Sequence, residues 1–259
     1  MTSARALPAV VAGVVLLAGC GGSAGGNAGA RERELTVFAA ASLRAAFTEL
    51  GQRFEAEHPG VEVSFSFAGS GDLASQVSEG APADVLATAD TATMQRLARD
   101  GLAPEQPALF ATNTLTIVTA PGNPEGVTSF ADLADPGLAV VVCAEQVPCG
   151  AAARAVEEVT GTALSPRSEE ASVTDVLAKV VAGEADAGLV YATDAAGAAD
   201  RVAAVPFPEA GQVVNDYPIA VLPDAGSPGL AQEFADLVTG EAGRAVLAAA
   251  GFGLPPAAR

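Results

Sequence analysis

Short apolar runs alternate along the chain with segments in which apolar residues recur every three or four positions. The run at 35–40 predicts a buried strand, and helical spacing follows at Leu43, Phe47, Leu50 and Phe54. Further strands are expected at 61–67, 83–87, 114–119, 138–142, 187–191, 202–205 and 219–222, and further helices at 73–77, 91–99, 151–159, 173–182, 230–237 and 244–249. This alternation indicates an α/β fold with mostly parallel sheets.

The first twenty residues have the pattern of an export signal. Arg5 precedes an apolar stretch at 6–18 that is too short to span a bilayer. Small residues lead to Cys20, as in a bacterial lipobox, and a Gly-rich segment typical of a flexible tether follows. We therefore expect a lipoprotein signal peptide at 1–19, a lipid on Cys20 and a tether at 20–33. An ordinary secretory leader with a chance cysteine is the alternative.

Composition narrows the possible functions. The net charge of −18 argues against nucleic acid as a partner, because phosphate binding needs a basic face. One His and three Cys cannot form a histidine-rich metal site or a conventional histidine relay. Half of the residues are hydrophobic, which is enough for an ordinary folded core.

Two serines follow predicted strands and precede predicted helices. Ser42 comes after the strand at 35–40, and Ser70 stands between two glycines after the strand at 61–67. Ligands of open α/β sheets bind at this edge, where helix N-termini present free N–H groups. Neutral donors gathered there would suit a fully ionised anion. From position alone, simple helix capping is the more common role for both serines.

Six short motifs, in order along the chain, resemble the periplasmic molybdate-binding proteins of the ModA family. They lie at 37–43, 67–71, 80–84, 147–150, 188–195 and 217–220, so the resemblance covers about 35 to 253. It implies a type II periplasmic-binding-protein fold, in which two α/β lobes are joined by a hinge that the chain crosses twice. The expected lobes are 34–112 plus 216–259, and 113–215.

The resemblance also implies a set of ligand-binding residues. Ser42 and Ser70 would each give a hydroxyl and a backbone N–H from the first lobe. The second lobe would give the backbone N–H groups of Cys149 and Val173 and the phenol of Tyr191. Tyr191 has an alternative role, because an aromatic residue at a strand end often belongs to the core.

Two positions depart from the family pattern. The family usually has Ala where this chain has Cys149, a difference that matters little if only the amide is used. The segment that ends at Val173 matches loosely, so Ser172 and Thr174 stay open as alternative donors.

With Cys20 assigned to lipid, Cys143 and Cys149 are expected to form a disulfide, because the compartment is oxidising and the loop between them is short. A reactive thiol pair is one alternative. A two-cysteine metal site is another, although His58 is the only histidine that could join it.

The function that the resemblance implies is that of an extracytoplasmic solute-binding lipoprotein, anchored to the outer face of the cell membrane. It would capture molybdate, and tungstate as well, and deliver it to the permease of an ABC importer. We expect a monomer without enzyme activity, cofactor or metal other than the bound oxyanion. Sulfate or another solute is the alternative ligand, and a thiol-redox lipoprotein using Cys143 and Cys149 or an adhesion lipoprotein is the alternative class.

Overall fold

The computed structural model describes residues 33–255. The expected signal peptide, the tether and the lipidated Cys20 therefore lie outside the described residues, except that Arg33 already belongs to the first strand. None of the helices between residues 33 and 255 is both long and apolar enough to cross a membrane.

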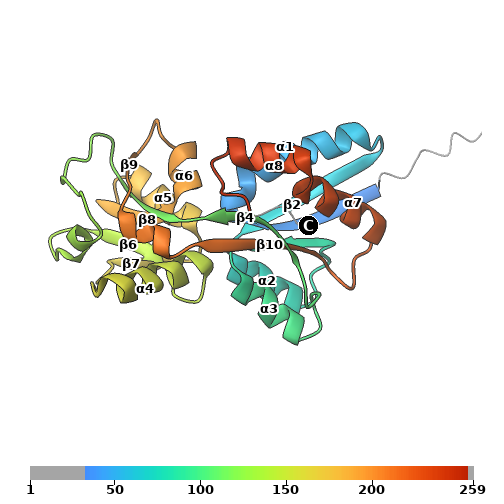
Figure 1. Cartoon of the computed structure of the whole chain (residues 1–259), viewed down its shortest axis with the longest axis horizontal. Helices are drawn as coiled ribbons and strands as arrows, with labels where there is room; N and C mark the ends of the chain where they lie inside the picture. The colour runs from blue at the N-terminus through green and yellow to red at the C-terminus, as the bar shows by residue number, and fades with distance from the viewer. Residues whose placement is uncertain (1–32, 256–259) are drawn as a thin grey trace, which may run out of the picture. The chain divides into compact units, whose positions relative to one another are not determined.

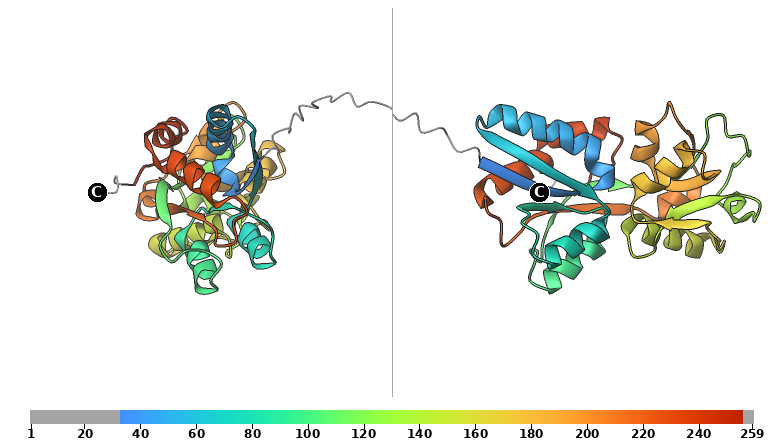
Figure 2. Two further views of the ribbon diagram at one scale, coloured as in Figure 1. Left: turned by 90° about the vertical axis from the view of Figure 1, so that its right-hand side faces the viewer. Right: turned by 180° about the vertical axis from the view of Figure 1, so that it is seen from behind.

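Two five-stranded sheets, each covered by helices on both faces, form two lobes (Figures 1 and 2). The first sheet is built from β1 (Arg33–Ala40), β2 (Val61–Ala68), β3 (Val85–Ala87), β4 (Ala108–Asn113) and β10 (Asn215–Val221). Its order is β2-β1-β3-β10-β4. One face carries α1 (Arg44–Glu57), α7 (Pro228–Thr239) and α8 (Glu241–Ala249), and the other carries α2 (Ser70–Ser78) and α3 (Thr91–Arg99).

The second sheet is built from β5 (Leu115–Thr119), β6 (Val140–Cys143), β7 (Ser168–Glu170), β8 (Ala187–Tyr191) and β9 (Ala203–Val205), in the order β7-β6-β8-β5-β9. Figure 1 shows α4 (Pro148–Thr160) on one face, with α5 (Val173–Val181) and α6 (Ala192–Gly197) on the other. Three short 3-10 helices, η1 (Ala41–Leu43), η2 (Ala131–Ala134) and η3 (Pro208–Gln212), complete the elements.

The chain passes between the lobes twice. It leaves the first sheet after β4 and enters the second at β5, and it returns through the segment from β9 to β10. Asn113 and Asn215, which we expected in the second lobe, are end residues of first-sheet strands. After α8, Gly253 bridges back to Thr112 in β4, so the described chain ends in the first lobe.

Both sheets are mixed, so the expectation of mostly parallel sheets was wrong. β1 runs parallel to β2 and β3, but β10 is antiparallel to β3 and β4. In the second sheet, β6 is parallel to its neighbours and β5 is antiparallel to both of its own. The antiparallel pairs arise because β5 and β10 follow the crossings between lobes, and not the helical connections that keep successive strands parallel.

Among the strands and α-helices of the described residues, three were not expected from the sequence. β4 has two exposed residues at its start, β7 is the charged stretch Ser-Glu-Glu at a sheet edge, and α6 is a helix of six residues. β4 is buried only after its first two residues, and β7 has no fully buried residue. Short elements of this kind give little periodic signal.

The core fixes α1 against the first sheet. Its apolar residues are buried as the helical spacing predicted, and Phe47 packs with its ring centroid 5.7 Å from that of Phe110 in β4 and 6.0 Å from that of Phe234 in α7. Because η1 connects β1 directly to this anchored helix, the core also fixes the position of Ser42 at the end of the sheet.

Candidate functional site

A small cavity lies between the two lobes, and all five expected ligand-binding residues line it: Ser42, Ser70, Cys149, Val173 and Tyr191. Its volume of about 20 Å³ is little more than a single water molecule needs, so it suits a compact ligand. The other lining residues are Ala, Gly, Pro, Val and Ser, with no charged side chain among them. We call this space the interlobe cavity.

A larger cavity of about 110 Å³ lies within the second lobe, beside α4. Charged residues line it, including Glu145, Arg154, Glu157 and Glu169. Arg154 already donates to Glu157 across 2.6 Å, which neutralises the one cation of this set. The larger cavity therefore offers an anion little, and the interlobe cavity is the better candidate.

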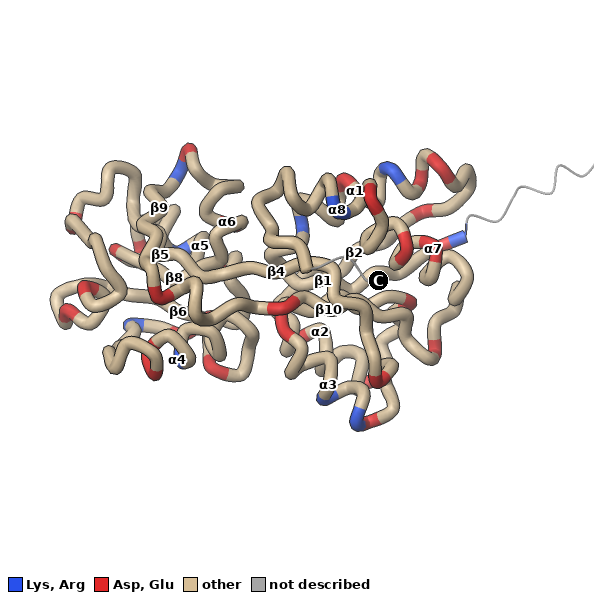
Figure 3. The backbone as a smooth tube through the Cα atoms, in the orientation of Figure 1, with Lys and Arg blue, Asp and Glu red and all other residues tan. Residues whose placement is uncertain are grey.

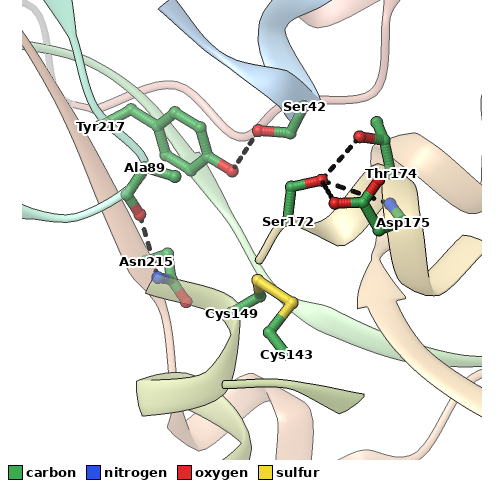
Figure 4. Close-up of a disulfide and its surroundings, with 9 residues drawn as sticks. All are labelled: Ser42, Ala89, Cys143, Cys149, Ser172, Thr174, Asp175, Asn215 and Tyr217. Carbon is green, nitrogen blue, oxygen red and sulfur yellow. Dashed lines mark hydrogen bonds between the residues drawn. A yellow bond between two sulfur atoms is a disulfide. The ribbon is translucent and has the colours of Figure 1, made fainter. Parts of the chain in front are cut away.

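Ser42 does not cap a helix. It lies within η1, and α1 begins two residues later with Leu43 at its N-cap and no side-chain cap bond. Its Oγ lies 3.0 Å from the hydroxyl of Tyr217 in β10 (Figure 4). The contact joins residues 175 positions apart, so the tertiary structure and not local capping determines how this serine is held.

Ser70 is the first residue of α2, and Gly69 occupies the N-cap. Its buried Oγ accepts a hydrogen bond from the backbone N–H of Ala89 at 3.0 Å. Within the described part of the chain, no acceptor is recorded for the proton of Ser70 itself. The hydroxyl therefore keeps a proton that it can donate into the cavity.

Cys149 lies in the first turn of α4, directly after Pro148. Helix N–H groups in the first turn have no partner within the helix, and Ala151 is the first residue of α4 whose N–H bonds backward, to Val147. A disulfide links Cys149 to Cys143 at the end of β6, with the two Cα atoms 5.6 Å apart (Figure 4). The bridge ties the cavity-lining turn to the second sheet.

The hydrogen bonds at the start of α5 and the cavity lining distinguish the three candidate donors, Ser172, Val173 and Thr174. Ser172 is the N-cap, and its Oγ accepts from the N–H of Asp175 at 3.3 Å and donates to the carboxylate of Asp175 at 2.6 Å. The hydroxyl of Thr174 lies 2.9 Å from the same Oγ (Figure 4). Both hydroxyls are thus engaged. The N–H groups of Val173 and Thr174 both lack an intrahelical acceptor in the first turn of α5, but Val173 lines the interlobe cavity and Thr174 does not.

Tyr191 ends β8 and lies almost wholly buried at the cavity. Its hydroxyl has no hydrogen-bond partner among residues 33–255. Burial raises the pKa of Tyr191 well above its usual value, so the phenol keeps its proton. An unsatisfied buried donor of this kind costs about 1–3 kcal/mol, a cost that a ligand accepting the proton would remove.

Together these residues form a site of donors. Three helix N-termini, those of α2, α4 and α5, meet at the interlobe cavity and add the positive ends of their dipoles. Asp and Glu outnumber Lys and Arg along the tube (Figure 3), but neither sign of charge lines this cavity. No group of three metal-binding side chains occurs in the described part of the chain. The arrangement can hold a compact, fully deprotonated anion.

Two contacts of the site were not predicted from the sequence. The amide of Ala89 holds Ser70, and the phenol of Tyr217 holds Ser42. Tyr217 stood in a motif that supported the resemblance, so its presence was a signal, but nothing in the sequence connected it to Ser42.

Comparisons with known proteins agree with this arrangement. Residues 35–253 match the family described as bacterial extracellular solute-binding protein. The chain is 56% identical over 223 residues to the molybdate-binding protein ModA of Mycobacterium tuberculosis, covering 86% of this chain and 85% of that one. It is 35% identical over 214 residues to the Escherichia coli protein of the same name, covering 76% and 80%.

Solved structures share the fold. The periplasmic molybdate-binding protein of Azotobacter vinelandii superposes with a TM-score of 0.74 at 23% identity, covering 85% of this chain and 99% of that one.

Proposed function

The chain belongs to the bacterial extracellular solute-binding protein family, and we propose that it captures molybdate between its lobes and delivers it to the permease of an ABC importer. The observation that carries this proposal is the interlobe cavity, which combines donors from both lobes with no charged side chain. The proposed hydrogen-bond donors to molybdate are the hydroxyls and amides of Ser42 and Ser70, the amides of Cys149 and Val173, and the phenol of Tyr191.

The donor set selects for charge state. Molybdate is a tetrahedral dianion that carries no proton at neutral pH, so every oxygen accepts. Hydrogen phosphate brings a proton that needs an acceptor, and leaving it unpaired costs about 1–3 kcal/mol. Sulfate matches molybdate in charge and shape, so cavity size must exclude it, and tungstate is expected to bind like molybdate.

The strongly acidic composition does not oppose anion binding. The net charge of −18 arises from carboxylates outside the cavity lining. Charges beyond the Debye length, about 8 Å at physiological ionic strength, are largely screened. The local donors therefore outweigh the distant carboxylates.

Binding is expected to close the lobes and to involve no catalytic step. Donors on opposite lobes reach one small ion together only in a closed form, which is the usual behaviour of a hinged binding protein. The protein would thus act as a carrier, monomeric and without a cofactor.

Calorimetry against molybdate, tungstate, sulfate and phosphate at equal ionic strength tests the proposal. We expect tight binding of molybdate and tungstate, weaker binding of sulfate and weak but measurable binding of phosphate. Sulfate binding more tightly than molybdate would make the chain a sulfate carrier, and absence of binding to all four would refute an oxyanion carrier.

The two cysteines of the second lobe support a structural role rather than thiol-redox chemistry. Cys143 and Cys149 are bonded to each other and both are buried, so a redox partner has little access. Alkylation of the native protein without reductant should modify neither residue. Free modification of both would revive the thiol-redox alternative.

For its location we propose lipidation at Cys20, which would hold the protein at the outer face of the membrane. Cys20→Ala should move the protein from the membrane to the soluble fraction while molybdate affinity stays unchanged, because the Gly-rich segment separates Cys20 from β1. A tenfold loss of affinity would show that residues before β1 take part in the binding fold.

A further inference from the structure

We propose that Tyr217 is a positioning residue that fixes the direction of the Ser42 hydroxyl and so makes the interlobe cavity discriminate against protonated oxyanions. The inference rests on the proposed function, because it concerns how the same cavity selects its ligand. It adds a residue that does not line the cavity.

The phenol of Tyr217 is held firmly behind Ser42. Its side chain is wholly buried, and aromatic rings surround it with centroids 5.5 Å away at Phe252, 5.9 Å at Tyr191 and 6.3 Å at Phe110. The two hydroxyls point toward each other across 3.0 Å (Figure 4). Tyr217 therefore has little freedom to turn its hydroxyl elsewhere.

Burial raises the pKa of Tyr217, so its proton is retained and needs an acceptor. Asn113 also lies near the phenol, but no hydrogen bond joins the two side chains: the Asn113 amide donates to Thr193 at 2.8 Å, and its oxygen accepts from the N–H of Thr114 at 3.0 Å. The ring of Tyr191 packs against that of Tyr217, but the Tyr191 hydroxyl forms no hydrogen bond within the described residues. Ser42 Oγ is thus the one acceptor that the structure records for Tyr217 among residues 33–255.

The direction of the hydrogen bond follows from this accounting. If Ser42 donated to Tyr217, the buried phenolic proton would have no acceptor, which is unfavourable. If Tyr217 donates to Ser42, the phenol is satisfied and the serine proton turns toward the cavity that Ser42 lines. Ser42 is thereby set as a donor to the ligand.

This orientation adds to the selectivity. The alternative arrangement, in which Ser42 gives its proton to a neighbour and accepts one from the ligand, is the arrangement that hydrogen phosphate needs. Tyr217 disfavours it, because the phenol would lose its acceptor. Removing the phenolic hydroxyl should therefore weaken molybdate binding and relax the discrimination against phosphate.

The test compares Tyr217→Phe, Ser42→Ala and the double variant by calorimetry with molybdate and inorganic phosphate at pH 8. We expect Tyr217→Phe to lower molybdate affinity about 3- to 10-fold and to lower the molybdate-to-phosphate affinity ratio by a similar factor. In the Ser42→Ala background, the same change should have no further effect.

Phe252→Leu is the matched control, since it loosens the packing on the Tyr217 ring but leaves both hydroxyls in place. It should reduce stability without changing the affinity ratio. An equal change of the ratio in Phe252→Leu, or unchanged molybdate affinity and ratio in Tyr217→Phe, would overturn the inference alone. Wild-type protein that binds no molybdate would overturn the proposed function as well.

A second measurement does not depend on the folding of Tyr217→Phe. The chain has two tyrosines, so Tyr191→Phe leaves Tyr217 as the sole tyrosine. The intensity ratio of the tyrosine Raman doublet distinguishes a phenol that donates from one that accepts. We expect the donor signature in ligand-free Tyr191→Phe protein, and an acceptor signature would overturn the inference.

Discussion

At the scale of single residues, the candidate site contains serine hydroxyls that can accept a hydrogen bond from the protein through a lone pair and donate their proton to a ligand. Ser70 accepts from the amide of Ala89, and Ser42 lies within hydrogen-bond distance of Tyr217. In the proposed arrangement both serines accept from neighbours in the protein, so each would keep its proton for an anion in the cavity.

Replacement of either serine should weaken ligand binding strongly. A hydrogen bond to a charged partner contributes about 1.5–3 kcal/mol, so Ser42→Ala and Ser70→Ala should each lower molybdate affinity roughly 10- to 150-fold. Each should also destabilise the ligand-free protein, because a buried partner, Tyr217 or the Ala89 amide, loses its own hydrogen bond. Calorimetry and thermal unfolding measure the two effects.

Ser75→Ala is the control for the serines. Ser75 lies in the same helix as Ser70, but it is exposed and bonds to the carbonyl of Gly71. The Ser75→Ala variant should bind molybdate with the affinity of the wild type. If both cavity serines behaved like Ser75, the assigned site would be wrong.

Asp194 gives a prediction about pH. Burial raises its pKa from 3.8 to about 7, and one carboxylate oxygen has no hydrogen-bond partner in the described structure. The folded protein therefore holds this proton at a pH where the unfolded chain has released it, and stability falls as the pH rises from about 4 through about 7. The ionised form is the unfavourable one in the fold.

Asp194→Asn should remove this dependence. Relative to the wild type, we expect the variant to gain stability between pH 5 and pH 8, on the order of 2 kcal/mol in the free energy of unfolding. Asp200→Asn, at a side chain that is 82% exposed, is the control and should show no such gain. Urea unfolding at several pH values decides, and parallel pH profiles for Asp194→Asn and the wild type would contradict the assigned pKa.

At the scale of elements, the site is assembled where strand ends and helix starts of two lobes meet closely. A Cβ atom at Gly69, the N-cap of α2, would overlap the carbonyl oxygen of Ala171 just before α5. The backbone angles of Gly69 are φ −58° and ψ 140°, which any residue adopts. Glycine is therefore needed there for the approach of the lobes and not for its own conformation.

Gly69→Ala should accordingly act on the closed form alone. We expect at least a tenfold loss of molybdate affinity, because the lobes can no longer meet at this point, with the ligand-free stability almost unchanged. Gly197→Ala in α6, where a Cβ meets no neighbour within 4 Å, should leave affinity unaffected. Normal affinity in Gly69→Ala, measured by calorimetry, would show that the contact with Ala171 is not needed for binding.

At the scale of the whole molecule, the proposed donors lie on both lobes, so we expect ligand binding and lobe closure to occur together. The contact between Gly69 and Ala171 and the small size of the interlobe cavity describe a form in which the lobes are together. Without an anion, the donors gain no hydrogen bonds when the lobes approach each other. An open form of the ligand-free protein should therefore be favoured.

Small-angle scattering should therefore show a smaller radius of gyration with saturating molybdate than without it. The control is the Ser42→Ala, Ser70→Ala double variant, measured at molybdate concentrations too low for it to bind the ion. It should stay expanded. An identical radius of gyration for the wild type with and without ligand would contradict closure on binding.

The sequence predicted most of the elements because their signal is local. The spacing of Leu43, Phe47, Leu50 and Phe54 marks one face of a helix, and that face is buried in α1. Buried strands such as β1 and β8 were found for the same reason. β4 and β7 were not, because β4 begins with two exposed residues and β7 has no fully buried residue, so neither gives a continuous apolar pattern.

The sequence alone thus determined the α/β class and the positions of most strands and helices. Through its motifs it also identified residues that line the cavity. Only the tertiary structure decided how these residues are held. Position could not show that Ser42 makes no helix-cap bond, nor that the hydroxyls of Ser172 and Thr174 are already engaged, because these hydrogen bonds depend on three-dimensional geometry. The partner of Ser42 lies 175 residues away on a strand that returns from the other lobe, and no local pattern records such a contact.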